Sequence, residues 1–134
     1  MMIKEVETIP TPAKAKKITR AGTIKEDVQT ALNLRINRFE FVGDIYTTCD
    51  GRYVSGLKKG HVDDCAYYPM RCYIRNIARE NGIDVDPWDV RRFYKVYSCP
   101  TKDGDRVFME IYFERIFRYI SDTINTLSEK RGNK

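Results

Sequence analysis

Four side chains that could bind a metal lie within one stretch of the chain: Cys49, His61, Cys65 and Cys72. Thiolate and imidazole groups are ligands that zinc prefers, and the spacing of His61 and Cys65 would place both on one side of a helix. No Cys-x-x-Cys pair accompanies them, and free cysteine is among the most buried residue types. We therefore favour cysteines that pack in the core over a metal site.

Catalytic arrangements are sparse in this sequence. His61, the single histidine, has Cys65 one helical turn away, but Asp63 and Asp64 between them oppose formation of a thiolate. The acidic segment 84–89 follows no nuclease pattern, and no glycine is followed by the Lys-Ser or Lys-Thr of a phosphate-binding loop. We expect a protein that is not an enzyme and uses no cofactor.

Basic residues with tyrosines among them give the strongest indication of function. Arg71, Arg75 and Arg79 recur every four residues, which aligns three guanidinium groups along one helix face. Arginine contacts phosphate with two nitrogens at once, and tyrosine stacks or donates hydrogen bonds. The candidate binding residues are Lys14, Lys16, Lys17, Arg20, Arg52, Lys58, Lys59, Tyr67, Tyr68, Arg71, Arg75, Arg79, Arg91, Arg92 and Lys95.

Three interpretations of these basic residues stay open. They could bind nucleic acid, or they could anchor a protein–protein interface, where arginine and tyrosine are also enriched. They could equally form a solvated surface whose charges are answered by nearby carboxylates. The residue types alone do not separate these interpretations.

Size and composition fit one folded domain. The chain has 134 residues with 24 basic and 19 acidic side chains, so its net charge of +5 favours acidic partners. No apolar run is long enough to span a bilayer, and residues 1–12 lack the apolar core of a secretory signal. We expect a cytoplasmic protein with reduced thiols and no membrane partner.

The first half of the chain is predicted to begin with a flexible basic arm, residues 1–21, ahead of a single domain over residues 22–134. Thr23 and Glu26 form a capping-box pattern at the start of a helix. Residues 38–42 alternate as a short strand, and Asp50-Gly51 favours a small hairpin, the alternative being a long basic loop.

In the second half, the arginine helix is predicted to start near Asp63 or Asp64, the alternative being a first turn at Pro69 after a looser turn. It is predicted to end at the glycine cap of Asn81-Gly82. Residues 90–99 are rich in strand-forming side chains and lead through a turn into a second strand. A last amphipathic helix begins near Phe113. The predicted fold is α+β, with a small, mainly antiparallel sheet, a C-terminal hairpin and about three helices.

The order of these features resembles that of small proteins encoded by phages and mobile elements of Gram-positive bacteria. The resemblance rests on the basic arm, on segments 22–28 and 38–41, on the arginine helix ending in Gly82-Ile83, and on the hairpin around Asp103-Gly104. Such proteins include inhibitors of host nucleases, anti-CRISPR proteins among them, which act by occupying a nucleic-acid-binding surface without chemistry.

From the residues and this resemblance we expect a non-catalytic accessory or inhibitor protein in the cytoplasm of a host cell. Its partner would be a host nucleic-acid-handling protein, such as a CRISPR effector nuclease, or the nucleic-acid complex of that protein. The alternatives are a regulator that binds DNA or RNA directly and an interaction module stabilised by zinc. The sequence leaves the oligomeric state open.

Overall fold

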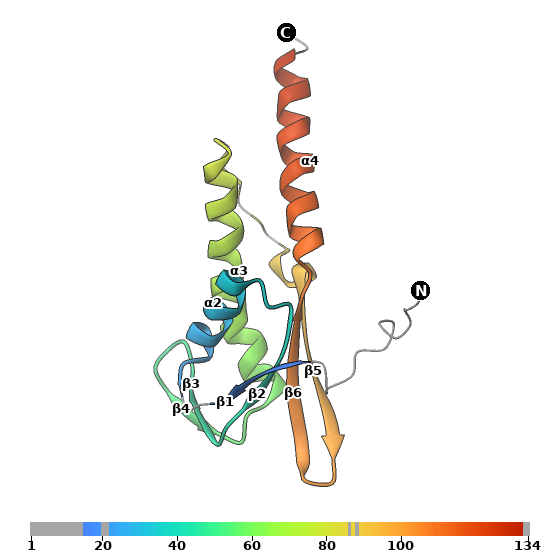
Figure 1. The fold of residues 1–134 in the computed structure, drawn as a ribbon. Helices are drawn as coiled ribbons and strands as arrows, with labels where there is room; N and C mark the ends of the chain where they lie inside the picture. The colour runs from blue at the N-terminus through green and yellow to red at the C-terminus, as the bar shows by residue number, and fades with distance from the viewer. Residues whose placement is uncertain (1–14, 20–21, 86, 88, 133–134) are drawn as a thin grey trace, which may run out of the picture.

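The computed structural model describes residues 15–19, 22–85, 87 and 89–132. It confirms the predicted α+β class with a mainly antiparallel sheet and a C-terminal hairpin (Figure 1). The elements in chain order are β1 (Lys16–Thr19), α2 (Ile24–Leu34), β2 (Arg38–Val42), β3 (Ile45–Thr47), β4 (Tyr53–Ser55), α3 (Lys59–Glu80), the 3-10 helix η2 (Val90–Phe93), β5 (Tyr94–Thr101), β6 (Gly104–Ile111) and α4 (Phe113–Gly132).

The main sheet has the strand order β1-β2-β6-β5. Strands β2, β6 and β5 are antiparallel to one another in turn, and β1 adds a parallel edge strand to β2. The β5–β6 hairpin is confirmed: Thr101 pairs with Gly104 across a two-residue turn. The hairpin around Asp50-Gly51 is also confirmed, because β3 and β4 form a separate two-stranded sheet. Gly51 has a φ of 87°, a conformation that favours glycine.

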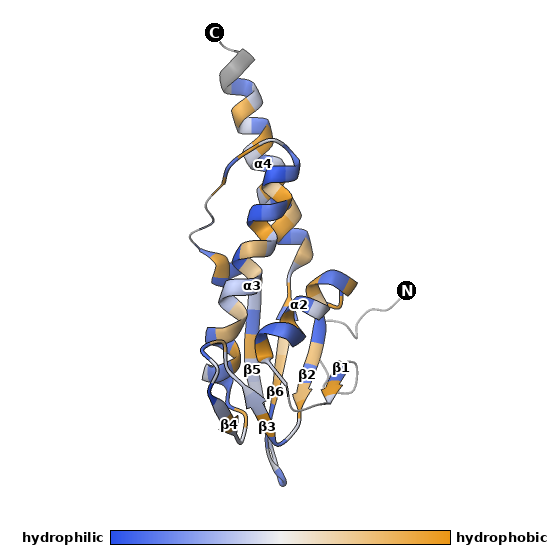
Figure 2. Ribbon diagram, turned by 90° about the vertical axis from the view of Figure 1, so that its left-hand side faces the viewer, coloured by the Kyte–Doolittle hydropathy of each residue, from blue (hydrophilic) through white to orange (hydrophobic). Residues whose placement is uncertain are grey.

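Helices α2 and α3 pack together beside the main sheet, and α4 extends away from it next to the second half of α3 (Figure 1). The core lies on the helix-facing side of the sheet, where Phe39, Val107 and Met109 are buried. Hydrophobic and hydrophilic residues alternate within the turns of α4, as expected for a helix with one covered face (Figure 2). The opposite face of the sheet holds Phe108, whose ring stacks on Tyr97 with centroids 5.4 Å apart.

The predicted flexible arm is wrong for Lys16–Thr19. These residues form β1, with Lys16 opposite Phe39 and Ile18 opposite Phe41. The pairing satisfies backbone groups of β2 that would otherwise lie at a sheet edge. The side chains of this segment, with Ile18 as the single apolar one, do not indicate this gain. The rest of the predicted arm, including Lys14 and Arg20, lies outside the described residues.

The predicted capping box at the start of α2 is wrong, although the boundary is right. Thr23 is the residue before the helix, but its side chain makes no capping hydrogen bond. Instead, the backbone before the helix pairs with β3. Thr23 forms a parallel bridge with Thr47, and the N–H of Thr47 donates to the carbonyl of Gly22 at 2.6 Å. These contacts hold the start of α2 against the β3–β4 sheet.

The predicted start of α3 is also wrong, since the helix begins at Lys59 rather than near Asp63 or Asp64, and Pro69 lies inside it. The predicted end is confirmed. The N–H of Ile83 donates to the carbonyl of Ala78 at 3.1 Å, and the N–H of Gly82 donates to that of Arg79 at 2.9 Å. This is a Schellman motif, with Gly82 at a φ of 77°.

The strand predicted over residues 90–99 begins four residues later than expected. Val90–Phe93 form the 3-10 helix η2, in which the N–H of Arg92 donates to the carbonyl of Asp89 at 3.1 Å. Val90 and Phe93 are buried while Arg91 and Arg92 face outward. The tight turn thus buries both apolar residues on one side, which a strand could not do at a three-residue spacing.

Candidate functional site

The three arginines of α3 lie on its outer face, and we call Arg71, Arg75 and Arg79 the arginine ridge. Arg71 and Arg75 are half-buried and Arg79 is exposed. The opposite side of the helix is buried at Val62, Cys65, Ala66, Pro69, Met70, Ile74 and Ala78. The spacing therefore produces the predicted cationic face, because the apolar residues between the arginines fix the rotation of the helix.

Two predicted tyrosines lie one turn before the ridge. Tyr68 is 50% exposed, and the Lys25 ammonium of α2 lies 4.6 Å from its ring centroid. A hydrogen bond with the Cys72 side chain raises the pKa of the Tyr68 phenol, while Arg71 and Arg75 act in the opposite direction. Tyr68 thus lies between the Lys25 ammonium of α2 and the arginine ridge of α3, with the ammonium in cation–π distance of its ring.

Tyr67 turns toward η2 rather than toward the ridge. The Arg91 guanidinium lies 5.3 Å from the Tyr67 ring centroid and forms an ion pair of 2.5 Å with Asp63. The Tyr94 hydroxyl donates to Asp63 Oδ1 at 2.9 Å, and burial followed by this hydrogen bond raises the pKa of Tyr94 above its ordinary value. The Arg91 charge is therefore largely occupied by the ion pair that holds η2 and β5 to α3.

The remaining predicted basic residues do not join one surface. Arg52 pairs with Asp50 at 3.0 Å on the β3–β4 turn, and Lys58 and Lys59 are exposed at the start of α3. The Lys95 ammonium lies 5.5 Å from the Tyr97 ring centroid, on the sheet face that points away from the core. The structure thus divides the predicted set among separate faces.

Lys16 and Lys17 are exposed on β1, at the opposite edge of the sheet from β5. Their side chains point to opposite faces of the sheet, because neighbouring residues of a strand alternate. Arg92, the last member of the predicted set, lies 3.8 Å from Asp89 in a weak, exposed ion pair. Tyr68 and the arginine ridge, with Lys25 as an unpredicted addition, form the group that the structure brings together.

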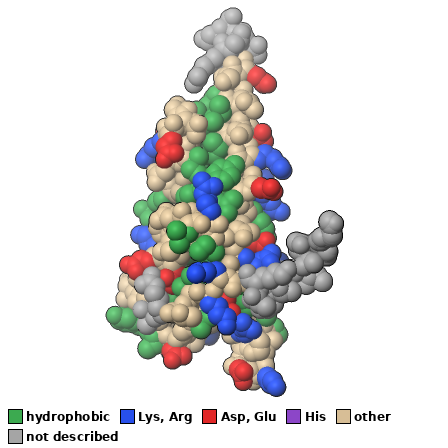
Figure 3. Space-filling view, viewed as in Figure 1, with side chains coloured by type: hydrophobic (Ala, Val, Ile, Leu, Met, Phe, Trp, Pro, Cys, Tyr) green, Lys and Arg blue, Asp and Glu red, His purple; other side chains and the backbone are tan. Residues whose placement is uncertain are grey.

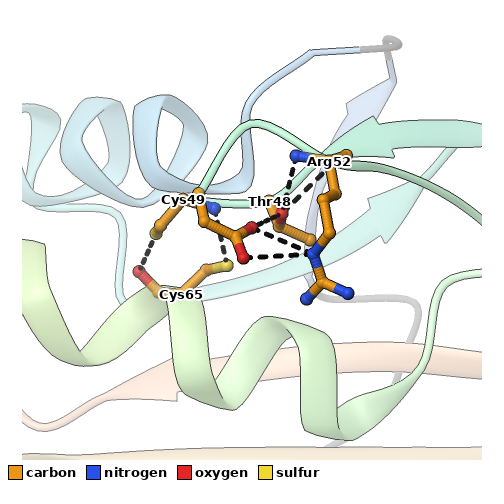
Figure 4. Close-up of polar contacts among 5 residues, drawn as sticks. Thr48, Cys49, Arg52 and Cys65 are labelled. Carbon is orange, nitrogen blue, oxygen red and sulfur yellow. Dashed lines mark hydrogen bonds and ion pairs between the residues drawn. The ribbon is translucent and has the colours of Figure 1, made fainter.

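The predicted thiol cluster has a structural role that the sequence did not reveal (Figure 4). Pro69 has no N–H, so the carbonyl of Cys65 cannot accept the usual helical hydrogen bond from it. The Cys49 thiol donates to that carbonyl at 3.4 Å, while the N–H of Cys49 donates to Cys65 Sγ at 3.2 Å. The β3–β4 turn thereby satisfies a backbone group that the proline leaves open inside α3.

The surroundings of Cys49 favour the neutral thiol over the thiolate. Cys49 is exposed on its outer side, but partial desolvation on the side that faces α3, followed by a side-chain hydrogen bond with Cys65, raises the pKa of its thiol to about 12. Cys49, His61 and Cys65 line a hollow of about 230 Å³, but Cys72 is not part of it. In the part of the chain that the structure describes, no group of three or more His, Cys, Asp or Glu side chains is arranged to hold a metal ion.

Two arginines outside the predicted binding set, Arg115 and Arg118, lie on the polar side of α4 next to η2. They line a hollow of about 320 Å³ together with Arg92, Phe93, Tyr119 and Asp122. Their three-residue spacing on an amphipathic helix was the available signal, but the proximity of η2 could not be read from the sequence.

Comparison with protein-family models, with curated proteins and with solved structures finds no match to this chain. Among the described residues, no helix is both long enough and apolar enough to cross a membrane. Assignment of a function therefore depends on the surface chemistry of the molecule itself.

Proposed function

We propose that this protein is a non-catalytic binding protein that uses the arginine ridge and Tyr68 to engage an acidic surface of a host nucleic-acid-handling protein, or of that protein's nucleic-acid complex. The observation that supports the proposal most directly is the state of the ridge. Within the described part of the chain, Arg75 and Arg79 have no ion-pair partner, whereas Arg52 and Arg92 each have one and Arg91 has two.

The composition of the surface favours a protein partner over a bare polyanion. Arginine and tyrosine are the residues that most often supply binding energy at protein interfaces. One exposed carboxylate, Glu80, directly follows Arg79 on α3, whereas Asp64 is paired with Arg91 at 3.6 Å. A nucleic-acid backbone would be repelled by Glu80, whereas a protein surface can place a basic residue against it.

The exposed ring of Tyr68 adds apolar contact area to the charged surface. It is one of the four large hydrophobic side chains that are exposed among the described residues. Its position beside Lys25 and the ridge provides an aromatic anchor with cations around it, an arrangement that suits the centre of an interface. Figure 3 shows hydrophobic, basic and acidic side chains interspersed over one face of the molecule.

The test is affinity capture from a bacterial lysate, performed with and without nuclease, using the full chain and two matched variants. Arg75→Gln/Arg79→Gln removes two charges from the ridge, and Lys17→Gln/Lys102→Gln removes two exposed charges elsewhere. We expect the ridge variant to lose the captured protein and the control variant to keep it, both remaining folded. Equal capture by the two variants would contradict the proposal, because net charge alone would then explain binding.

A second candidate is direct binding of DNA or RNA, favoured by the position of an exposed tyrosine and a ridge of guanidinium groups on one helix. Titration of labelled duplex and single-stranded nucleic acid at two salt concentrations separates the candidates. Direct binding predicts a steep loss of affinity as salt rises. Nuclease-resistant capture without any binding to nucleic acid at low salt would reject this second candidate.

A further inference from the structure

The hollow between η2 and α4 is lined by guanidinium groups from two elements that are distant in the sequence. Arg92 comes from η2, and Arg115 and Arg118 come from the first turns of α4. Asp122 is the single carboxylate among the described lining residues, so three positive charges face one negative charge. This balance creates a positive potential inside a concave surface, where the field of fixed charges is focused.

The two arginines that α4 contributes to this hollow keep their charge available for a ligand. Arg115 Nη1 donates to the carbonyl of Arg92 at 3.3 Å, and the Arg115 guanidinium lies 4.3 Å from the Tyr112 ring centroid. These contacts orient the guanidinium group and leave other N–H donors available. Arg118 is exposed and makes no ion pair with the described residues. Of the three arginines, Arg92 alone has a carboxylate partner among the described residues, the weak pair with Asp89 at 3.8 Å.

An aromatic wall lies beside these charges. Tyr119 is half-buried and packs against Phe93 with ring centroids 5.5 Å apart. The hollow adjoins a second one that is lined by Pro87, Asp89, Arg92, Phe93 and Tyr119. The charged part and the aromatic part of the surface therefore meet at Arg92 and Tyr119.

We infer that this hollow binds the phosphate group of a nucleotide, with Arg92, Arg115 and Arg118 on the phosphate and Tyr119 against the base. Guanidinium groups match phosphate oxygens in geometry and charge, and an aromatic ring beside them adds stacking. The size of about 320 Å³ suits a small ligand. A free nucleotide and the phosphorylated end of a nucleic-acid strand offer the same chemistry, and this inference does not depend on the arginine ridge.

The test is calorimetric titration of the full chain with two pairs of probes. The first pair is adenosine 5′-monophosphate and adenosine, and the second is a short single strand with and without a 5′-phosphate. We expect the phosphorylated member of at least one pair to bind about tenfold tighter, the effect of one charge-assisted contact. Binding by the mononucleotide identifies a free nucleotide as the source, and binding by the strand alone identifies a strand end. Equal binding within both pairs, or no binding at all, would overturn the inference.

Three variants locate the site. Arg118→Gln should weaken binding of the phosphorylated probe about tenfold, and Tyr119→Leu should weaken it while leaving weak binding of inorganic phosphate unchanged. Lys102→Gln, on the β5–β6 turn, removes an equal charge and should bind as the unmodified chain does. Because Arg118 is exposed, its replacement should leave the circular dichroism spectrum unchanged. If Arg118→Gln and Lys102→Gln bind equally, the hollow is not the site.

Discussion

Replacement of Cys49 by alanine tests whether the thiol compensates for the proline inside α3. The thiol donates to the carbonyl of Cys65, which Pro69 leaves without a helical partner, and Cys65 is only 4% exposed. A buried acceptor that loses its donor costs about 1–3 kcal/mol, and a thiol is a weak donor. Because the Cys49 side chain is exposed, little apolar burial is lost with it. We therefore expect Cys49→Ala to lower the free energy of unfolding by about 1 kcal/mol.

The same reasoning predicts that this cost depends on residue 69. Pro69→Ala restores an N–H that can donate to the Cys65 carbonyl, so the thiol is no longer needed. The proline change by itself combines opposite effects: better helix propensity, a more flexible unfolded chain and loss of buried ring atoms. The sign of the stability change caused by Pro69→Ala alone is therefore less informative than its coupling energy with Cys49→Ala. In the Pro69→Ala background, Cys49→Ala should cost close to zero, which gives a coupling energy of about 1 kcal/mol.

Urea unfolding of the four proteins in this double-mutant cycle, in reducing buffer, measures the coupling. Cys99→Ala serves as a control, because Cys99 lies on β5 and should cost the same in both backgrounds. If Cys49→Ala costs the same in the unmodified chain and in the Pro69→Ala background to within about 0.5 kcal/mol, the Cys49 thiol does not act through the Cys65 carbonyl and the reasoning is refuted.

Three further outcomes follow from individual contacts. The raised pKa of Tyr94 means that folding favours its neutral form. Its contribution to stability should therefore be full below the unfolded pKa of about 10 and be lost as the pH rises above it. The drop in urea midpoint between neutral and alkaline pH should be smaller for Tyr94→Phe than for the unmodified chain. With its pKa near 12, exposed Cys49 should be alkylated far more slowly in the folded protein than in urea, as peptide mapping can show. Arg106→Met should cost about 2 kcal/mol in urea unfolding, because Glu40 is 4% exposed and pairs with Arg106 at 2.6 Å; a loss below about 0.5 kcal/mol would show that Glu40 is stabilised by other groups.

Elements with strong local signals were predictable from the sequence, and the failures share a physical cause. Alternation over β6 and the glycine cap of α3 specify structure through neighbouring residues, so they needed no tertiary information. The edge strand β1 and the turn η2 depend on distant partners instead. Lys16–Thr19 pairs with β2, and Arg91 of η2 is held by Asp63 on α3. No local pattern encodes contacts of this kind.

For the candidate site, the position of the arginines on their helix was predictable from the sequence, but their contacts with other elements were not. Helical spacing correctly placed the arginine ridge on one face, because the rotation of a helix is fixed by its own apolar residues. It could not show that Arg91 and Arg92 lie near Asp63 and Asp89, or that Lys25 of α2 approaches Tyr68. The sequence shows that a residue is basic, but only the tertiary structure shows whether a carboxylate lies within ion-pair distance of it.

That distinction guides where binding should be sought in this molecule. Arginines that already contact carboxylates must break those contacts before they can bind a ligand, and the energy of the broken pair reduces the affinity gained. Among the described residues, Arg75 and Arg79 on α3 and Arg118 on α4 are outside any ion pair, and they belong to two separate surfaces. The ridge is flanked by an exposed tyrosine, which suits a large partner, whereas Arg118 borders a hollow that suits a small phosphate group. Because the two surfaces share no residue, loss of binding at one should leave the other intact, and the ridge and hollow variants test that independence directly.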